Sequence, residues 1–362
     1  MRIAYVINSV EGGGASAPVP AVCDVLRAHG ADVAIFALTG RDRRGLPAME
    51  AAALDVHIRS GGQKDHRAAL RWLDDEIMAW RPDVIWTSLT RATLLGQIVG
   101  QRRRLPVVSW QHAAYLKPAN RFLLRMRQRR SALWIADSEC VAALTRKRLA
   151  VGENRLLTWP LFAANDDTPI TGAWSPGRVL RIGSLGRLHP VKGYDTLIDA
   201  VSVLTRSHFQ PNLHWELLIA GDGGERERLQ RMINVEGLDN VKLVGFAGDP
   251  QQFLKSLHLY VQPSRSEGFC IAAHEAMLAG LPVIATRVGE MQHSIEPGRS
   301  GQIVSPDDVF ELARAMTKSL MVPERLHSMG LNARARVLDK FGAAAFEATG
   351  AAVMRRVAAL IS

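Results

Sequence analysis

The sequence predicts an α/β protein made of two doubly wound, Rossmann-like domains that face each other across a cleft. Short runs of β-branched residues alternate with segments of helical periodicity along the chain, which is the pattern of βαβ units around a parallel sheet. Residues 166–177 are turn-rich and poor in apolar residues, and they divide this alternation into two series. A length of 362 residues also fits two domains. We therefore expect ligands at the carboxyl ends of the strands.

The first series, residues 1–165, predicts an N-terminal domain. Its expected strands are short runs rich in Val, Ile and aromatic residues, at 3–8, 32–38, 84–88, 107–110 and 133–137. Its expected helices have apolar residues at helical spacing, at 15–29, 66–80, 92–102, 120–130 and 140–149.

The second series follows the expected linker at 166–177 and predicts a domain over 178–342. The same two patterns place its strands at 180–185, 215–220, 241–244, 257–262 and 283–286. They place its helices at 193–205, 225–235, 250–255, 271–279, 307–320 and 323–340. A last amphipathic helix is expected at about 343–359, within a C-terminal segment 343–362.

The charge of the chain is concentrated in the first domain. The chain carries a net charge of +10, and residues 1–165 account for all of it, with 24 basic and 14 acidic residues. No acidic residue occurs between Asp83 and Asp137, an interval that holds ten basic ones. Such an excess indicates a polyanionic partner, although a solvated basic face is the plainer alternative. Nucleic acid is disfavoured because aromatic residues make up only 6% and no nucleic-acid-binding module is visible.

Cysteine usage and the N-terminus indicate a compartment. Cys23, Cys140 and Cys270 are three in number and show no CxxC spacing, so neither a disulfide framework nor a zinc site is expected. The apolar run at the N-terminus is too short for a signal peptide, and no stretch approaches the ~20 apolar residues of a membrane-spanning helix. We expect a cytoplasmic protein, or one attached peripherally to the cytoplasmic face of a membrane.

The segment 120–130 is the strongest candidate for an anion-facing surface. It interleaves five arginines with apolar residues, a composition typical of an interfacial helix on anionic lipid. In the alternative reading, Leu123, Leu124 and Met126 belong to the core and the arginines are merely solvated. The arginines are Arg121, Arg125, Arg127, Arg129 and Arg130.

Three segments carry residues suited to binding an anion or a polyhydroxylated ligand. Glu-Gly-Gly-Gly-Ala-Ser (11–16) follows the first strand and precedes a helix, where glycines let backbone approach an anion. The loop 183–193 carries Arg187 and Lys192, two cations beside a helix start that suit a diphosphate. The segment 264–277 carries Glu267 in a loop and Glu275 in the helix that follows. A tight turn, two exposed cations and a helix cap with a surface ion pair are the respective structural alternatives.

Together these motifs resemble glycosyltransferase family 4, whose members are retaining, nucleotide-sugar-dependent enzymes of the GT-B fold. The resemblance rests on Gly-Arg…Lys-Gly (186–193), Ala-Gly-Asp-Gly (220–223), Val-Gly-Phe (244–246) and Pro-Ser…Glu-Gly-Phe…Glu-Ala-Met…Gly-Leu-Pro-Val-Ile-Ala-Thr (263–286). It is strong over 178–340 and loose over 1–165. It implies that the C-terminal helix crosses back to the N-terminal, acceptor-binding domain.

The resemblance also implies a role for individual residues. Arg187 and Lys192 would hold the donor diphosphate and stabilise the leaving group, and Glu275 would accept hydrogen bonds from the ribose. Glu267 would grip the transferred sugar together with neighbouring backbone amides. Further donor contacts would come from Gly13, Gly14, His112, the backbone of Val244, Gly245 and Phe246, and the amides of Gly268, Phe269 and Cys270. Where many members carry a histidine four residues after the glycine pair, this chain has Pro18.

The implied function is transfer of a sugar from a UDP- or GDP-linked donor to a hydroxyl of a lipid-linked or other glycan acceptor, in cell-surface polysaccharide or lipopolysaccharide assembly. No Asp-x-Asp motif occurs, so no metal or other cofactor is expected and Arg187 with Lys192 would take the place of Mg²⁺. Another GT-B enzyme, such as a sugar-nucleotide epimerase, or a non-catalytic sugar-binding protein remains the alternative.

Overall fold

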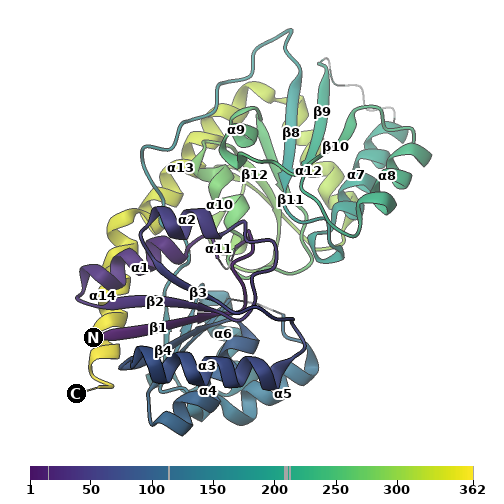
Figure 1. The fold of residues 1–362 in the computed structure, drawn as a ribbon. Helices are drawn as coiled ribbons and strands as arrows, with labels where there is room; N and C mark the ends of the chain where they lie inside the picture. The colour runs from purple at the N-terminus through teal and green to yellow at the C-terminus, as the bar shows by residue number, and fades with distance from the viewer. Residues whose placement is uncertain (15, 113–114, 208–210, 212, 362) are drawn as a thin grey trace. The chain divides into compact units, whose positions relative to one another are not determined.

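The chain forms two compact units in a computed structural model that describes residues 1–14, 16–112, 115–207, 211 and 213–361 (Figure 1). Unit 1 comprises Met1–Ala163 together with Ala343–Ser362, and unit 2 comprises Ala164–Gly342. The C-terminal segment thus belongs to the same unit as the N-terminus.

Unit 1 is built on a seven-stranded parallel sheet with the order β3-β2-β1-β4-β5-β6-β7. The sheet order reverses between β1 and β4, the kind of position at which doubly wound sheets bind ligands. The strands are β1 (Arg2–Ile7), β2 (Asp32–Ala37), β3 (Asp55–Ile58), β4 (Val84–Ser88), β5 (Val107–Gln111), β6 (Leu133–Ala136) and β7 (Leu156–Thr158). The helices are α1 (Val19–Ala28), α2 (Leu46–Ala51), α3 (His66–Trp80), α4 (Thr90–Arg103), α5 (Pro118–Arg127), α6 (Glu139–Leu149) and α14 (Ala343–Ala358), with 3₁₀ turns η1 (Gln128–Arg130) and η2 (Glu153–Arg155).

Helices cover both faces of the unit 1 sheet, and successive side chains of a strand point to opposite faces. Along β1, Ile3 and Tyr5 face the core that contains α1 and α14, whereas Ala4 and Val6 face the core formed with α3 and α4. Strands buried on both faces are typical of parallel sheets with helices on each side.

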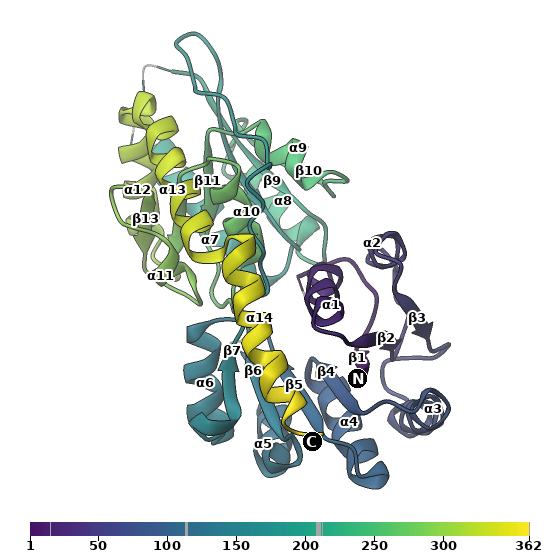
Figure 2. The ribbon, with the colours of Figure 1, turned by 90° about the vertical axis from the view of Figure 1, so that its left-hand side faces the viewer.

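Helix α14 completes the unit 1 core, and Figure 2 shows it lying along this unit. Phe346 and Val353 of α14 are buried in the same core as Trp159. The Trp159 indole Nε1 donates a hydrogen bond to the carbonyl of Phe346 over 3.1 Å. A Cβ atom on Gly350 would overlap the side chains of Trp159 and Val25, so a glycine is needed where α14 crosses them.

Unit 2 is built on a six-stranded parallel sheet with the order β10-β9-β8-β11-β12-β13, and the order reverses between β8 and β11. The strands are β8 (Leu180–Leu185), β9 (Trp215–Ala220), β10 (Val241–Gly245), β11 (Leu259–Gln262), β12 (Val283–Thr286) and β13 (Gly301–Val304). The helices are α7 (Tyr194–Arg206), α8 (Arg226–Val235), α9 (Pro250–Lys255), α10 (Ile271–Leu278), α11 (Met291–Ser294), α12 (Val309–Met321) and α13 (Leu326–Phe341), with 3₁₀ turns η3 (Pro190–Lys192) and η4 (Pro323–Arg325).

Some elements differ from the sequence-based prediction. The expected helix over 15–29 begins only at Val19, with Pro18 as its N-cap, and its expected start at Ala15 lies outside the described residues. The expected helix over 120–130 is α5, which begins at Pro118 and gives way to η1 after Arg127.

The segment 166–177, expected as a linker, belongs to unit 2 and is held there by hydrogen bonds. The Arg334 guanidinium donates to the carbonyl of Thr168 over 2.8 Å, and the Thr171 N–H donates to the carbonyl of Ala279 over 2.8 Å. The segment is irregular, but the buried Arg334 requires its carbonyls as hydrogen-bond acceptors.

Candidate functional site

The charged candidates Arg187, Lys192 and Glu267 lie at the carboxyl ends of β8 and β11, the two strands between which the sheet order reverses. The strands are directly paired, with Tyr260 opposite Gly183. Arg187 and Lys192 occupy the loop that leaves β8, and Glu267 occupies the loop that leaves β11. Parallel pairing therefore brings together two motifs that are far apart in the sequence.

Close backbone approaches hold the loops at this edge. Gly193 has a left-handed conformation with φ of 66°, and a Cβ atom there would overlap the carbonyl oxygen of Pro263 after β11. Gly221, at the end of β9, has φ of 145°, and a Cβ atom there would overlap the carbonyl oxygen of Gly186. The two glycines let three loops come together without space for a side chain between them.

Glu267 is held by a network of three donors that all reach its Oε1 atom. Lys192 Nζ donates over 2.7 Å, the Ser264 hydroxyl over 2.6 Å and Gln262 Nε2 over 3.2 Å. Behind them, the Tyr260 hydroxyl donates to Gln262 Oε1 over 2.9 Å. The Glu267 side chain is only 11% exposed and that of Lys192 21%. The carboxylate therefore has one fixed orientation. The sequence motif includes Ser264 but predicts neither its bond to Glu267 nor that of Gln262.

The electrostatics of this cluster follow from burial and pairing. Burial is the largest single effect on the pKa of Lys192 and lowers it, but the charge and hydrogen bond of Glu267 together with nearby Cys270 outweigh burial, so the pKa is raised. Burial raises the pKa of Glu275, in α10. Arg187 is exposed in the loop after β8 and lies close enough to Lys192 to act against its positive charge. Lys192 and Glu267 largely neutralise each other, which leaves the charge of Arg187 directed to solvent.

The remaining unit 2 candidates differ in whether their side chains are exposed or buried. Val244 and Phe246 flank Gly245 at the end of β10, and their side chains are exposed. Phe269 is buried and stacks on His274 at a centroid distance of 4.1 Å, so its side chain belongs to the core.

Two further candidates precede α10. Cys270 is the N-cap of α10, buried and left-handed with φ of 70°. Gly268, just before Phe269 and Cys270, accepts a hydrogen bond at its carbonyl from the Glu290 N–H over 3.0 Å.

The unit 1 candidates lie at the carboxyl edge of its sheet. Gly13 and Gly14 are in a turn between β1 and α1, where the Ser16 N–H donates to the Gly13 carbonyl over 3.1 Å. His112 follows β5, and its Nε2 lies 3.0 Å from the hydroxyl of Ser88 at the end of β4.

The surroundings of His112 determine its protonation. The Ser88 hydroxyl is in turn 2.9 Å from the hydroxyl of Tyr5, and the His112 Nδ1 lies 3.9 Å from a carboxylate oxygen of Asp137, just after β6. Burial lowers the pKa of His112 to about 3, so the imidazole is neutral at physiological pH. Sequence analysis identified His112 but neither Ser88 nor Asp137.

The basic segment has both a buried and an exposed side. Leu124 is fully buried, whereas Phe122 is 63%, Leu123 44% and Met126 69% exposed. Only Leu124 of the three residues in the alternative reading is therefore core. Of the five arginines, Arg121, Arg125, Arg129 and Arg130 are exposed. Arg127 is half-buried and therefore does not belong to the exposed face. Its burial, and to a smaller extent the positive charge of nearby Arg130, lowers its pKa.

Two features are absent from the described part of the chain. It contains no group of three or more His, Cys, Asp or Glu residues placed to hold a metal ion. None of its helices combines the length and apolarity needed to cross a membrane.

Two protein-family models match the chain, one for each half. The model described as Glycosyltransferase Family 4 matches residues 12–162, and the model described as Glycosyl transferases group 1 matches residues 175–336. Together the two matches include every candidate residue of both units.

Curated relatives match over part of their length. The lipopolysaccharide core biosynthesis mannosyltransferase LpcC of Rhizobium leguminosarum bv. viciae is 30% identical over 196 residues, which are 52% of this chain and 54% of the relative. A D-inositol 3-phosphate glycosyltransferase of Gordonia bronchialis is 33% identical over 159 residues, 41% of this chain and 34% of the relative. The matches thus span about half or less of these relatives.

Solved structures match over nearly the whole chain. Anabaena Alr3699/HepE in complex with UDP-glucose superposes with a TM-score of 0.83 at 21% identity, covering 98% of this chain and 100% of that one. The sucrose-phosphate synthase of Thermosynechococcus elongatus gives a TM-score of 0.81 at 20% identity, with coverage of 99% and 100%. At these identities the likeness establishes the fold, which is the α/β GT-B fold.

Proposed function

Because the chain belongs to glycosyltransferase family 4, we propose that it transfers a sugar from a nucleotide-diphosphate sugar to an acceptor hydroxyl, with retention at the anomeric carbon. The observation that carries the proposal is the cluster at the reversal point of the unit 2 sheet. There Lys192 and Glu267 are paired over 2.7 Å beside the exposed Arg187. Cations and a fixed carboxylate are the two kinds of group that a sugar diphosphate needs.

In the proposed reaction the bond between the anomeric carbon and the diphosphate oxygen breaks, and its electron pair stays on the diphosphate. Arg187 and Lys192 stabilise that charge. The acceptor oxygen forms the new bond on the face from which the diphosphate leaves, and its proton passes to a diphosphate oxygen. Removal of one preorganised donor of this kind typically costs ~3–4 kcal/mol in the transition state. No metal enters this scheme.

Glu267 and Glu275 bind hydroxyl groups in this proposal. The three donors on Glu267 Oε1 fix its carboxylate for contact with the transferred sugar. Glu275 is proposed to accept from the ribose, and its raised pKa reflects burial. Neither carboxylate forms a covalent bond to the sugar, so isolation of a glycosyl ester on Glu267 would contradict the mechanism.

The donor and the reaction are tested in sequence. A thermal-shift screen of UDP, GDP and their hexose conjugates identifies the base, since a ligand that binds the native state raises the melting temperature by mass action. Nucleotide release is then measured with and without a glycan acceptor. Acceptor-dependent release that falls at least about 100-fold in Arg187→Ala and Lys192→Ala supports transfer. Conversion of the nucleotide sugar into its epimer with no net release of nucleotide would favour an epimerase, and full turnover of both variants would refute the diphosphate contacts.

We further propose a lipid-linked saccharide as acceptor, and peripheral binding of unit 1 to an anionic membrane surface on the cytoplasmic side. The support is the exposed apolar group Phe122, Leu123 and Met126 beside exposed arginines. Sedimentation with vesicles that contain anionic lipid at low salt tests this. The variant Phe122→Ser with Met126→Ser should bind less, and absence of binding by the unaltered protein would refute it.

A further inference from the structure

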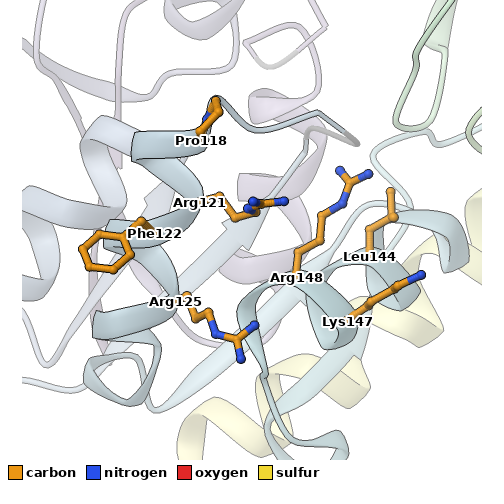
Figure 3. A pocket seen from close by; sticks show the side chains of 7 residues that line it. All are labelled: Pro118, Arg121, Phe122, Arg125, Leu144, Lys147 and Arg148. Carbon is orange, nitrogen blue, oxygen red and sulfur yellow. The ribbon is translucent and has the colours of Figure 1, made fainter.

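A pocket with a volume of about 510 Å³ lies in unit 1 between α5 and α6. Four basic side chains line it: Arg121 and Arg125 from α5, and Lys147 and Arg148 from α6. In Figure 3, Arg121 and Arg125 extend from α5 toward α6, and the Arg148 side chain rises beside Arg121. The size falls in the range of ordinary small-molecule sites.

Three of the four cations in this pocket lack an acidic partner among the described residues. No acidic residue lines it, and within the described chain Arg121, Arg125 and Lys147 form no ion pair. Like charges gathered in one concave site repel each other, and a bound anion removes that cost. By contrast, Arg103 and Arg59 of unit 1 are paired with aspartates.

The kind of cation indicates the kind of anion. Three of the four are arginines, whose planar guanidinium groups donate two parallel hydrogen bonds to phosphate oxygens. Leu144 and Pro118 add apolar lining at the same pocket. This combination suits a phosphate that is attached to a less polar group.

We propose that the pocket between α5 and α6 binds a phosphate group that carries at least two negative charges. The phosphate belongs either to a soluble phosphorylated saccharide or to the headgroup of an anionic lipid, and both present the same oxygens to the guanidinium groups. In the proposed transferase this phosphate would be part of the acceptor or of the membrane that carries it, and in that respect the inference rests on the proposed function. Its test requires no donor and no turnover.

Isothermal titration with inorganic pyrophosphate tests the pocket in the full chain. The variant Arg121→Gln with Arg125→Gln should bind at least about tenfold more weakly than the unaltered protein, because two charge-assisted contacts are lost. The matched control is Arg67→Gln with Arg71→Gln, which removes two exposed arginines at the same spacing from α3. It should change the affinity less than about twofold if binding is site-specific rather than due to net charge.

Pyrophosphate can also occupy the proposed diphosphate site of unit 2, so the variant Arg187→Gln is titrated in parallel. Binding that persists in Arg187→Gln and disappears in the α5 variant supports the pocket, whether or not transfer is later observed. Binding that disappears only in Arg187→Gln overturns it, as does an equal loss in the α5 and α3 variants. The proposal is also overturned if the unaltered protein does not bind pyrophosphate, or if the substitutions at Arg121 and Arg125 leave its affinity unchanged.

Vesicles of phosphatidylcholine with and without phosphatidic acid distinguish the two sources. Binding that depends on phosphatidic acid, competes with pyrophosphate and is lost in the α5 variant identifies a lipid headgroup. Pyrophosphate binding that is lost in the α5 variant, with unchanged vesicle binding, identifies a soluble phosphate ligand. Each result supports the phosphate pocket and assigns its occupant.

Discussion

Replacement of Lys192 by Met should destabilise unit 2 by leaving a buried carboxylate short of its counter-charge. Breaking a fully buried ion pair from one side costs about 3–5 kcal/mol. Glu267 keeps two neutral donors, Ser264 and Gln262, and the Lys192 side chain is 21% exposed. We therefore expect a loss of about 2–3 kcal/mol, since part of the charge remains solvated and hydrogen-bonded.

The size of the effect in a melting experiment follows from the size of unit 2, which spans Ala164–Gly342. A domain of this size loses about 2–4 °C per kcal/mol, so the unit 2 transition in scanning calorimetry should fall by about 4–12 °C. Adding Glu267→Gln to Lys192→Met removes the uncompensated charge. The double variant should therefore be more stable than Lys192→Met alone, with a coupling energy of about 1–2 kcal/mol.

The same pair predicts a pH dependence. The folded-state pKa of Lys192 is raised above its usual 10.5, so its stabilising contribution is fully present below pH 10.5 and is lost as the pH rises through the folded pKa. The difference in the free energy of unfolding between the unaltered protein and Lys192→Met should shrink above that pH. A melting temperature unchanged by Lys192→Met, or strictly additive effects in the double variant, would refute this account of the pair.

Three further predictions concern individual groups. His112 has a pKa of about 3 in the folded state against an ordinary value of 6.5, so below pH 6.5 the unfolded state binds the extra proton and stability falls as the pH falls. In urea titrations His112→Gln should lack this dependence, which is at most about 1.4 kcal/mol per pH unit; identical slopes would contradict it. Ser264→Ala should lower kcat/KM by about tenfold in the nucleotide-release assay, because one donor to Glu267 is lost, and unchanged kinetics would exclude a positioning role. Gly221→Ala should cost about 3 kcal/mol by calorimetry, whereas Gly224→Ala, which meets no neighbouring atom, should cost less than about 1 kcal/mol; equal losses would argue against the close approach.

The central elements of both sheets could be predicted because their burial on two faces leaves long apolar signals. The strand at Val84–Ser88 and the helix at His66–Trp80 have the predicted limits. Edge strands such as Asp55–Ile58 and Leu156–Thr158 were not predicted, because three or four residues are too few to show a period. The late start of α1 follows from Pro18, which fixes the chain at a helix N-terminus.

At the candidate site, the sequence predicted which residues are loop residues but not the contacts among them. Lys192 and Glu267 are 75 residues apart, and only the pairing of β8 with β11 brings them together. Gln262 could not be distinguished from an ordinary strand residue, since its function in the network depends on burial beside Glu267. Likewise, Ser88 and Asp137 come from strands that flank β5 and have no shared motif with His112.

The position of α14 has a consequence for synthesis on the ribosome. The strands of unit 1 emerge before the whole of unit 2, and α14 emerges only after unit 2. Until then Trp159 and Val25 lack the apolar side chains that cover them in the finished protein. The nascent first unit must therefore wait, with an apolar surface open to chaperones or to aggregation, while about 180 further residues are translated. Unit 1 therefore gains its full stability only after the whole of unit 2 and then α14 have been translated.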